Sequence, residues 1–135
     1  MLKLIIGVKG TGKTKVLIDM VNSALAVTKG DVVCIEKGAQ LRFDIKPAVR
    51  LVNSDEYLIN DASALYGFIT GMLASNHDVT DLFVDGTLRI CQRDMAAFDV
   101  LLTKLEALLE KININLTMTV SMPIEEASET VRKYI

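Results

Sequence analysis

Residues 7–14 read GVKGTGKT and directly follow the apolar run of residues 2–6. This stretch fits the spacing G-x-x-x-x-G-K-[ST], in which glycines let the backbone wrap closely around phosphate oxygens. The lysine of the pattern, Lys13, supplies a positive charge to the phosphates, and Thr14 offers a hydroxyl to Mg²⁺. Apolar residues then recur at helical spacing over residues 13–26. The sequence therefore predicts a strand, a phosphate-binding loop (P-loop) and a helix whose dipole is directed at the phosphates.

A nucleotide at this loop, ATP or another NTP, is expected to contact most of the stretch: Gly7, Lys9, Gly10, Thr11, Gly12, Lys13 and Thr14. The alternative is an ordinary glycine-rich turn between a strand and a helix, without a ligand.

Length, composition and charge limit the class of protein. A chain of 135 residues supports one core of ordinary size, so we expect a single domain over residues 1–135. Half of the residues are hydrophobic and the mean hydropathy is +0.34, yet no apolar run has the length of a membrane span, so no membrane partner is expected. The net charge of −2 argues against a nucleic-acid partner, because binding to a phosphate backbone needs a basic face.

The cysteines and the N-terminal residues indicate the compartment. Cys34 and Cys91 lack the C-x-x-C or histidine spacing of a metal site, and two cysteines do not suggest a disulfide framework. The first residues belong to a predicted strand and show no basic leader or cleavage site. We therefore expect a cytoplasmic protein with free thiols.

Predicted strands and helices alternate along the chain, which is typical of an α/β domain with a mainly parallel sheet. Strands are predicted over residues 2–6, 31–35, 81–85 and 112–122. Helices are predicted over residues 13–27, from 53–56 to 75–76, over 95–109 with Asp94 as its cap, and from Pro123 onward. Residues 41–51 alternate between apolar and polar and are interpreted as a hairpin, or as a strand plus an edge strand. We expect these elements to form a three-layer α/β sandwich.

The last predicted strand alternates strictly over residues 112–122, with apolar residues at even positions and polar residues at odd ones down to Ser121. Successive side chains of a strand point to opposite faces, so one face of this strand is expected to be polar or thinly covered.

Asp85 is the predicted metal-organising residue. It ends the apolar run of residues 82–84, so it would project from the carboxyl edge of a buried strand, where ligands of open α/β sheets bind. A triphosphate site needs such a carboxylate beside Mg²⁺, and Asp85 with Thr14 forms the predicted metal site. The alternative is an Asp that only caps the turn at residues 86–87.

On the P-loop and Asp85 the chain resembles P-loop NTPases, as a minimal member of the additional-strand ATPases, which include recombinase-type (RecA-like) and rotary ATPase catalytic domains. The resemblance covers residues 1 to about 122, and only the P-loop is a specific motif. It implies that the last strand lies between the P-loop strand and the Asp85 strand. The same loop also resembles that of pilus-retraction (twitching-motility) ATPases, but that family's amino-terminal domain is absent from this sequence.

The resemblance also implies a base. Many additional-strand ATPases carry a Glu directly after the metal-binding Asp, and Gly86 stands there in this chain. Recombinase-type and rotary ATPases instead place the catalytic Glu at the end of the strand after the P-loop helix, which here is Glu36. The resemblance thus implies that Glu36 orients the attacking water while Lys13 stabilises phosphate charge. The alternative is a solvated Glu36 paired with Lys37 or another surface cation.

Other polar residues are weaker candidates. The resemblance implies that Thr119 or Ser121 reads the γ-phosphate, although both also fit the polar face of an alternating strand. Arg89 and Arg93 follow Asp85 and are either arginine fingers, acting across a subunit interface, or solvated loop residues.

Three functions remain open from the sequence. The first is a small ATP-binding protein with weak, Mg²⁺-dependent NTPase activity, which works with a nucleotide as a homo-oligomer or with a protein partner. The second is a sensing module that binds a nucleotide without turnover, which Gly86 favours. The third is a small-molecule (nucleoside-type) kinase, for which no arginine-rich lid is evident.

Overall fold

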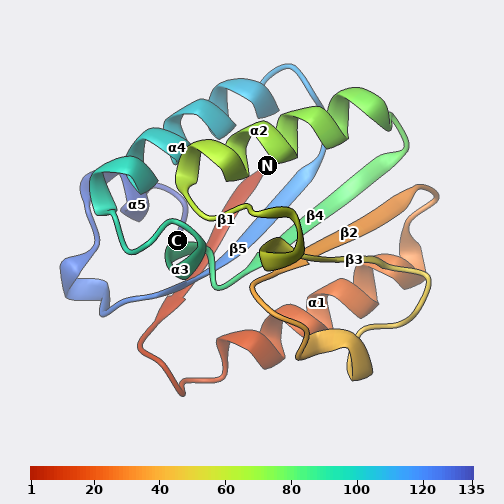
Figure 1. Cartoon of the computed structure of the whole chain (residues 1–135), viewed down its shortest axis with the longest axis horizontal. Coiled ribbons are helices and arrows are strands. Elements are labelled where there is room, and N and C mark those ends of the chain that lie inside the picture. The colour runs from red at the N-terminus through yellow and green to blue at the C-terminus, as the bar shows by residue number, and fades with distance from the viewer.

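Five strands form one sheet in which every neighbouring pair runs parallel, in the order β1-β5-β4-β2-β3 (Figure 1). This computed structural model describes residues 1–135. The strands are β1 (Leu2–Gly7), β2 (Asp31–Glu36), β3 (Arg50–Asn53), β4 (Val79–Asp85) and β5 (Asn115–Ser121). β5 lies between β1 and β4, as the resemblance implies.

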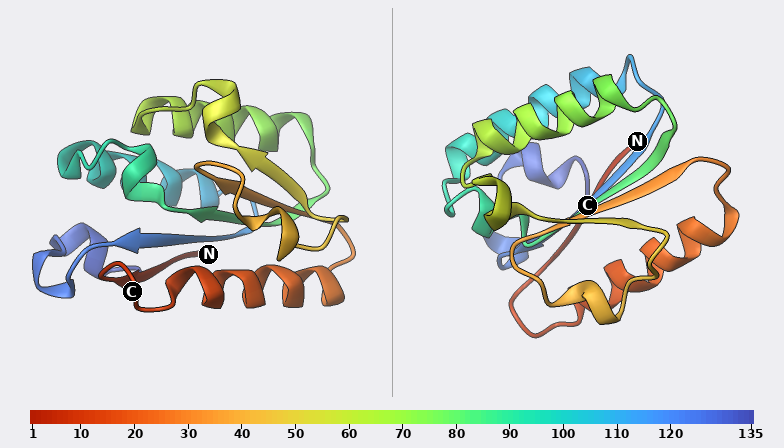
Figure 2. Two further views of the ribbon diagram at one scale, coloured as in Figure 1. Left: turned by 60° about the horizontal axis from the view of Figure 1, so that its bottom comes forward. Right: turned by 45° about the vertical axis from the view of Figure 1, so that its right-hand side comes forward.

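Helices cover both faces of the sheet, which gives the predicted three-layer α/β sandwich. In the left view of Figure 2, α1 lies along one face, and α2 and α4 lie on the other. The α-helices are α1 (Lys13–Val27), α2 (Ala62–Ser75), α3 (Thr87–Ile90), α4 (Met95–Leu109) and α5 (Glu129–Arg132). Three short 3₁₀ turns are η1 (Leu41–Phe43), η2 (Ser54–Tyr57) and η3 (Ile124–Glu126). None of the helices combines the length and the apolar character that crossing a membrane requires.

The core is divided by the sheet. On the α1 face, Leu17 and Val21 are one helical turn apart and pack with Cys34 of β2 and Phe83 of β4. The larger cluster lies on the face covered by α2 and α4, where Phe98 is fully buried. Asp94 caps α4 as predicted, with its carboxylate accepting a hydrogen bond from the Ala97 N–H at 3.0 Å.

The hairpin predicted over residues 41–51 is wrong, whereas the alternative edge strand is present as β3, parallel to β2. Residues 41–43 form η1 in place of a strand. The side chains buried against α1 are those of Leu41, Ile45 and Val49. The buried apolar residues of this segment are therefore four positions apart, and not two as in a strand. Phe43, which completed the apparent alternation, is 85% exposed.

Two helix starts lie later than predicted. α2 begins at Ala62, and its cap is Asp61, whose carboxylate accepts from the Ala64 N–H at 2.7 Å. Between η2 and this cap, Leu58 adopts a left-handed backbone with φ 56° and is 77% exposed, so it does not continue a helix. Pro123 precedes only the turn η3, and the last helix is short and capped by Ser128.

The polar face of β5 is not thinly covered. Thr117 and Thr119 are 5% and 2% exposed, and they pair with Phe83 and Ile5 on the α1 face of the sheet. Helix α1 covers this face, so the alternation of β5 reflects buried hydroxyl groups.

β1 and β3 form the two edges of the sheet. The C-terminal segment meets the outer edge of β1, where the Leu4 N–H donates to the Tyr134 carbonyl at 2.8 Å. Tyr134 also donates from its hydroxyl to Glu106 on α4.

Candidate functional site

The predicted P-loop has the backbone that its glycines suggest. Gly10 and Gly12 have φ of 87° and 86°, in the left-handed region that favours glycine, and Gly12 is the residue before α1. The first N–H groups of a helix lack intrahelical acceptors and carry the positive end of its dipole. The loop of residues 8–12 therefore leads from β1 into a helix N-terminus that is suited to an anion.

Side chains inside the loop fix its shape. The Thr11 hydroxyl and the Lys13 ammonium both donate to the Val8 carbonyl, at 2.7 and 2.9 Å. A Cβ added to Gly7 would lie 2.7 Å from the Thr11 hydroxyl oxygen, so Gly7 is needed for this packing. The Thr11 hydroxyl thus stabilises the loop from within. The backbone N–H of Thr11 is the group that remains available to a ligand.

Lys13 is held at the floor of the site. Lys13 as a whole is only 9% exposed, and loss of hydration on burial lowers its pKa below the usual value, while the nearby Asp85 carboxylate acts in the opposite direction. A partly desolvated ammonium interacts strongly with a phosphate that approaches it, because water screens the pair less.

Asp85 and Thr14 meet although they are 71 residues apart in the sequence. The Thr14 hydroxyl donates long hydrogen bonds to both carboxylate oxygens of Asp85, at 3.3 and 3.4 Å. On the other side, the Thr119 hydroxyl donates to Asp85 at 2.7 Å and accepts from the Gly86 N–H at 2.8 Å. Thr119 therefore orients the Asp85 carboxylate toward Thr14 and the P-loop. The sequence identified Thr119 only as a candidate phosphate sensor, and its contact with Asp85 was missed.

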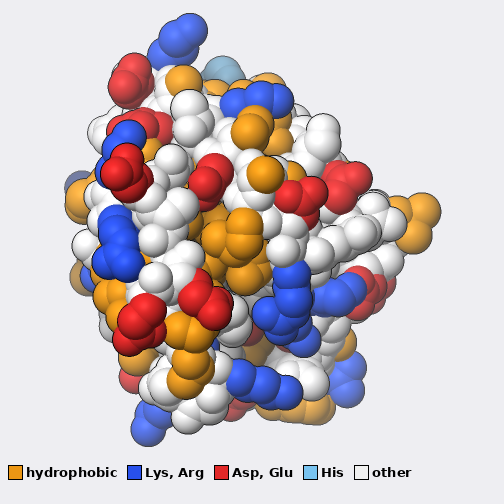
Figure 3. Space-filling view, turned by 90° about the vertical axis from the view of Figure 1, so that its left-hand side faces the viewer, with side chains coloured by type: hydrophobic (Ala, Val, Ile, Leu, Met, Phe, Trp, Pro, Cys, Tyr) orange, Lys and Arg blue, Asp and Glu red, His pale blue; other side chains and the backbone are white.

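These groups surround a cavity of about 580 Å³ at the carboxyl ends of the strands. It is lined by Lys9, Gly10, Gly12, Lys13, Thr14, Gln40, Leu41, Asp85, Gly86, Arg89, Arg93, Thr119 and Ser121. Asp85 is the only carboxylate among these residues, against four cationic side chains. Figure 3 views this end of the molecule and shows groups of Lys and Arg side chains in its lower half. The balance of charge suits a polyanion that is accompanied by a cation.

Glu36 lies beside this cavity but does not line it. Its carboxylate is 3% exposed and accepts from the backbone N–H groups of Gln40 at 2.9 Å and of Leu41 at 3.0 and 3.2 Å. It is therefore neither solvated nor paired with Lys37, which instead forms a salt bridge with Asp55 at 2.7 Å. Glu36 fixes the backbone of two residues that do line the cavity, and its role as a base stays a prediction.

The Gly86 position explains how Arg89 reaches the cavity. A Cβ added to Gly86 would lie 3.1 to 3.6 Å from the guanidinium atoms of Arg89, so this side chain crosses the space that a residue larger than glycine would fill. Arg93 lines the same cavity from a left-handed backbone with φ 56°, which L-residues other than glycine seldom adopt. Both arginines are thus at the site within one chain.

Both cysteines are free thiols, as predicted, and the structure shows that both are buried. Burial raises the pKa of Cys34 to about 12, and the carboxylates of Asp85 and Glu36 act in the same direction. Burial likewise raises the pKa of Cys91 to about 12, with Asp61 and Asp94 contributing. Neither thiol is therefore a nucleophile at neutral pH.

The structure thus brings together Lys9, Gly10, Gly12, Lys13, Thr14 and Asp85 around one cavity, with Gly7 and Thr11 supporting the loop and Glu36 behind it. The sequence does not predict Gln40 or Leu41 at the cavity, because Leu41 falls in the predicted hairpin and no motif includes Gln40. No protein-family model and no curated protein matches the chain.

Proposed function

We propose that the chain binds a nucleoside triphosphate, with ATP as the first candidate, together with Mg²⁺ at the P-loop cavity, and that it hydrolyses the nucleotide slowly. The observation that carries the proposal is the contact of Thr14 with Asp85 across the sheet, beside the Lys13 ammonium. A hydroxyl at the start of a phosphate-binding helix and a carboxylate at the end of another strand form the usual protein part of a Mg²⁺–triphosphate site.

The donor set fits Mg²⁺ and not a metal held by protein alone. No group of three or more His, Cys, Asp or Glu side chains is placed to hold a metal ion. Mg²⁺ is commonly bound by one or two protein oxygens and completes its shell with water and phosphate oxygens. Thr14 and Asp85 supply two such oxygens. When bound, the ion would neutralise charge that develops on the β- and γ-phosphates.

The roles of the chain's own groups follow from their positions. Backbone N–H groups of residues 10–14 bind the phosphates. The Lys13 ammonium gives up its hydrogen bond to the Val8 carbonyl and donates to phosphate oxygens instead. Thr119 holds the Asp85 carboxylate in place. Arg89, which crosses Gly86, is positioned to contact the terminal phosphate from the same chain.

A sensing module without turnover is the second candidate, and the contacts of Glu36 favour it. The side chain implied as the base already accepts hydrogen bonds from Gln40 and Leu41 and is buried behind the cavity. Because Glu36 is buried and does not line the cavity, its side chain would have to move away from these N–H groups to orient a water there. In both candidates the cytoplasm is the proposed location, since free thiols such as Cys34 and Cys91 suit a reducing compartment. A homo-oligomer or a protein partner remains part of the proposal.

Calorimetric titration with ATP, GTP and ADP, with and without Mg²⁺, tests binding, and phosphate release tests turnover. Lys13→Ala is the decisive variant, and Lys15→Ala is its control, because Lys15 is an exposed lysine two residues away that does not line the cavity. We expect Mg²⁺–ATP binding that Lys13→Ala weakens by about 1.5–3 kcal/mol and that Lys15→Ala leaves unchanged. Unchanged ATP affinity of a folded Lys13→Ala protein contradicts the proposal. Steady phosphate release selects slow hydrolysis, and tight binding without release selects the sensor.

A further inference from the structure

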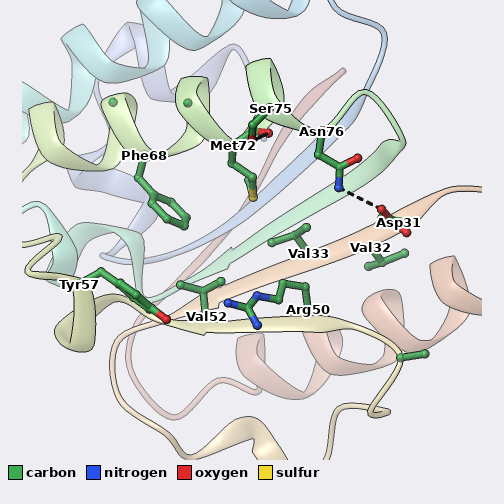
Figure 4. Close-up of a pocket in the computed structure, with 13 residues that line it drawn as sticks. Asp31, Val32, Val33, Arg50, Val52, Tyr57, Phe68, Met72, Ser75 and Asn76 are labelled. Atoms are coloured by element: carbon green, nitrogen blue, oxygen red, sulfur yellow. Dashed lines mark hydrogen bonds between the residues drawn. The ribbon is translucent and has the colours of Figure 1, made fainter.

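A second cavity, larger than the one at the P-loop, lies between α2 and the strands β2 and β3 (Figure 4). Its volume of about 790 Å³ is within the range of small-molecule sites. None of its lining residues lines the P-loop cavity, so it is a separate feature of the molecule.

The walls of this groove are apolar. Phe68 and Met72 extend from α2 toward the sheet, where Val33 and Val52 face them from neighbouring strands (Figure 4). Gly71 of α2 also lines the groove, and a Cβ added there would meet no atom within 4 Å. The helix therefore leaves room beside these side chains for an apolar body.

Two polar side chains lie on the β3 side of the groove. The Arg50 guanidinium, carried by β3, extends along the groove in the direction of the Tyr57 hydroxyl, and Figure 4 shows Val52 between them. Neither side chain makes a hydrogen bond within the molecule, and the single salt bridge of the chain joins Lys37 and Asp55. The carboxylate that lines the groove, Asp31, lies beyond Val33 and accepts from the Asn76 amide at 3.0 Å. Arg50 is exposed and forms no salt bridge, so its positive charge is available to a ligand in the groove.

We propose that this groove binds a small organic molecule with an apolar body and one carboxylate. A guanidinium matches a carboxylate in a bidentate geometry, and the Tyr57 hydroxyl is a further donor on the same side of the groove. The apolar body would lie along α2 beside Gly67 and Gly71, where added Cβ atoms would meet nothing, and against Phe68 and Met72, which pack on the buried valines of the sheet. A matching amine would be repelled by Arg50, and a matching alcohol would leave the guanidinium without a charged partner. The proposal does not depend on nucleotide binding at the P-loop.

Octanoate is a suitable probe, with octylamine and octan-1-ol as probes of the same chain length and different charge. Binding is measured by calorimetry and by two-dimensional NMR of the labelled full chain without nucleotide. We expect octanoate to bind and to change the NMR chemical shifts of Phe68 and Met72. We expect that octylamine does not bind. Arg50→Met should lower octanoate affinity at least about tenfold, because this is the change in affinity that the loss of one hydrogen bond between charged groups causes. The affinity for octan-1-ol should change little. Arg42→Met is the control, because Arg42 is a nearby arginine that does not line this groove.

Gly71→Leu tests the same groove by filling it. Leucine is a better helix former than glycine, so the variant should fold, and it should abolish binding of both octanoate and octan-1-ol. Equal affinities for octanoate and octan-1-ol that Arg50→Met leaves unchanged would show an unselective apolar surface and overturn the proposal. Absence of octanoate binding to the folded protein would overturn it as well. A dimer in sedimentation velocity that Gly71→Leu dissociates would show that the groove is an interface between copies of the chain, which also overturns it.

Discussion

Glu36→Gln separates the two roles that this residue can have. The carboxylate is 3% exposed, and its two oxygens accept three hydrogen bonds from the N–H groups of Gln40 and Leu41. In glutamine one oxygen becomes an NH₂ group, so at least one of these N–H groups then faces a donor. Loss of a hydrogen bond to a charged group costs about 1.5–3 kcal/mol. In a chain of this size that loss lowers the melting temperature by on the order of 5–10 °C.

Urea and thermal unfolding measure this loss, and Glu56→Gln is the control because Glu56 is exposed and makes no hydrogen bond. A Glu36→Gln protein as stable as Glu56→Gln would refute the anchoring of residues 40–41 by Glu36. Phosphate release from the same proteins tests the base. If Glu36 orients water, turnover is abolished while ATP affinity changes little, since the interaction acts in the transition state. Wild-type turnover that survives the substitution would show that the base lies elsewhere.

Further predictions concern the charged groups and the thiols. Lys13→Ala should weaken ATP binding by about 1.5–3 kcal/mol in calorimetry while the circular dichroism spectrum stays native. Asp85→Asn should weaken binding of Mg²⁺–ATP more than that of Mg²⁺-free ATP, and equal losses would contradict a metal role. Arg89→Ala should reduce ATP affinity more than ADP affinity, and a parallel loss would exclude a γ-phosphate contact. Burial raises the pKa values of Cys34 and Cys91 from 9.0 to about 12, so the stability tied to their protonation is present below pH 9 and is lost toward pH 12. The free energy of unfolding should fall there by up to about 1.4 kcal/mol per pH unit for each thiol, and a flat alkaline profile would contradict this.

The sequence predicted those parts of the fold in which one signal dominates. Buried parallel strands such as β2 and β4 appear as continuous apolar runs, and α4 combines an apolar stripe with the cap Asp94. The hairpin prediction for residues 41–51 was wrong because the positions of Leu41 and Ile45 fit both the two-residue alternation of a strand and a spacing of four residues. Only the packing of these side chains against α1 decides between the two. The start of α2 was misplaced because acidic residues suited to a helix start also fit the 3₁₀ turn η2.

The candidate site shows the same division between local and long-range information. The predicted P-loop and Asp85 can be proposed from the sequence because each stands in a short local pattern. The contact of Thr119 with Asp85, the contacts of Glu36 with residues 40–41 and the path of Arg89 across Gly86 arise from sheet order and loop packing. No local pattern encodes such contacts, so they required the structure.

The position of β1 at the edge of the sheet has a consequence for handling the protein. An edge strand presents unpaired N–H and C=O groups that can pair with a strand of another molecule, which leads to aggregation. The Tyr134 carbonyl takes the N–H of Leu4 on this edge, and the Tyr134 hydroxyl ties the C-terminal segment to Glu106. Release of that segment would expose the strand that leads into the predicted P-loop. Residues 131–135 therefore cover part of this edge and limit intermolecular β-pairing at the strand that precedes the proposed phosphate-binding loop.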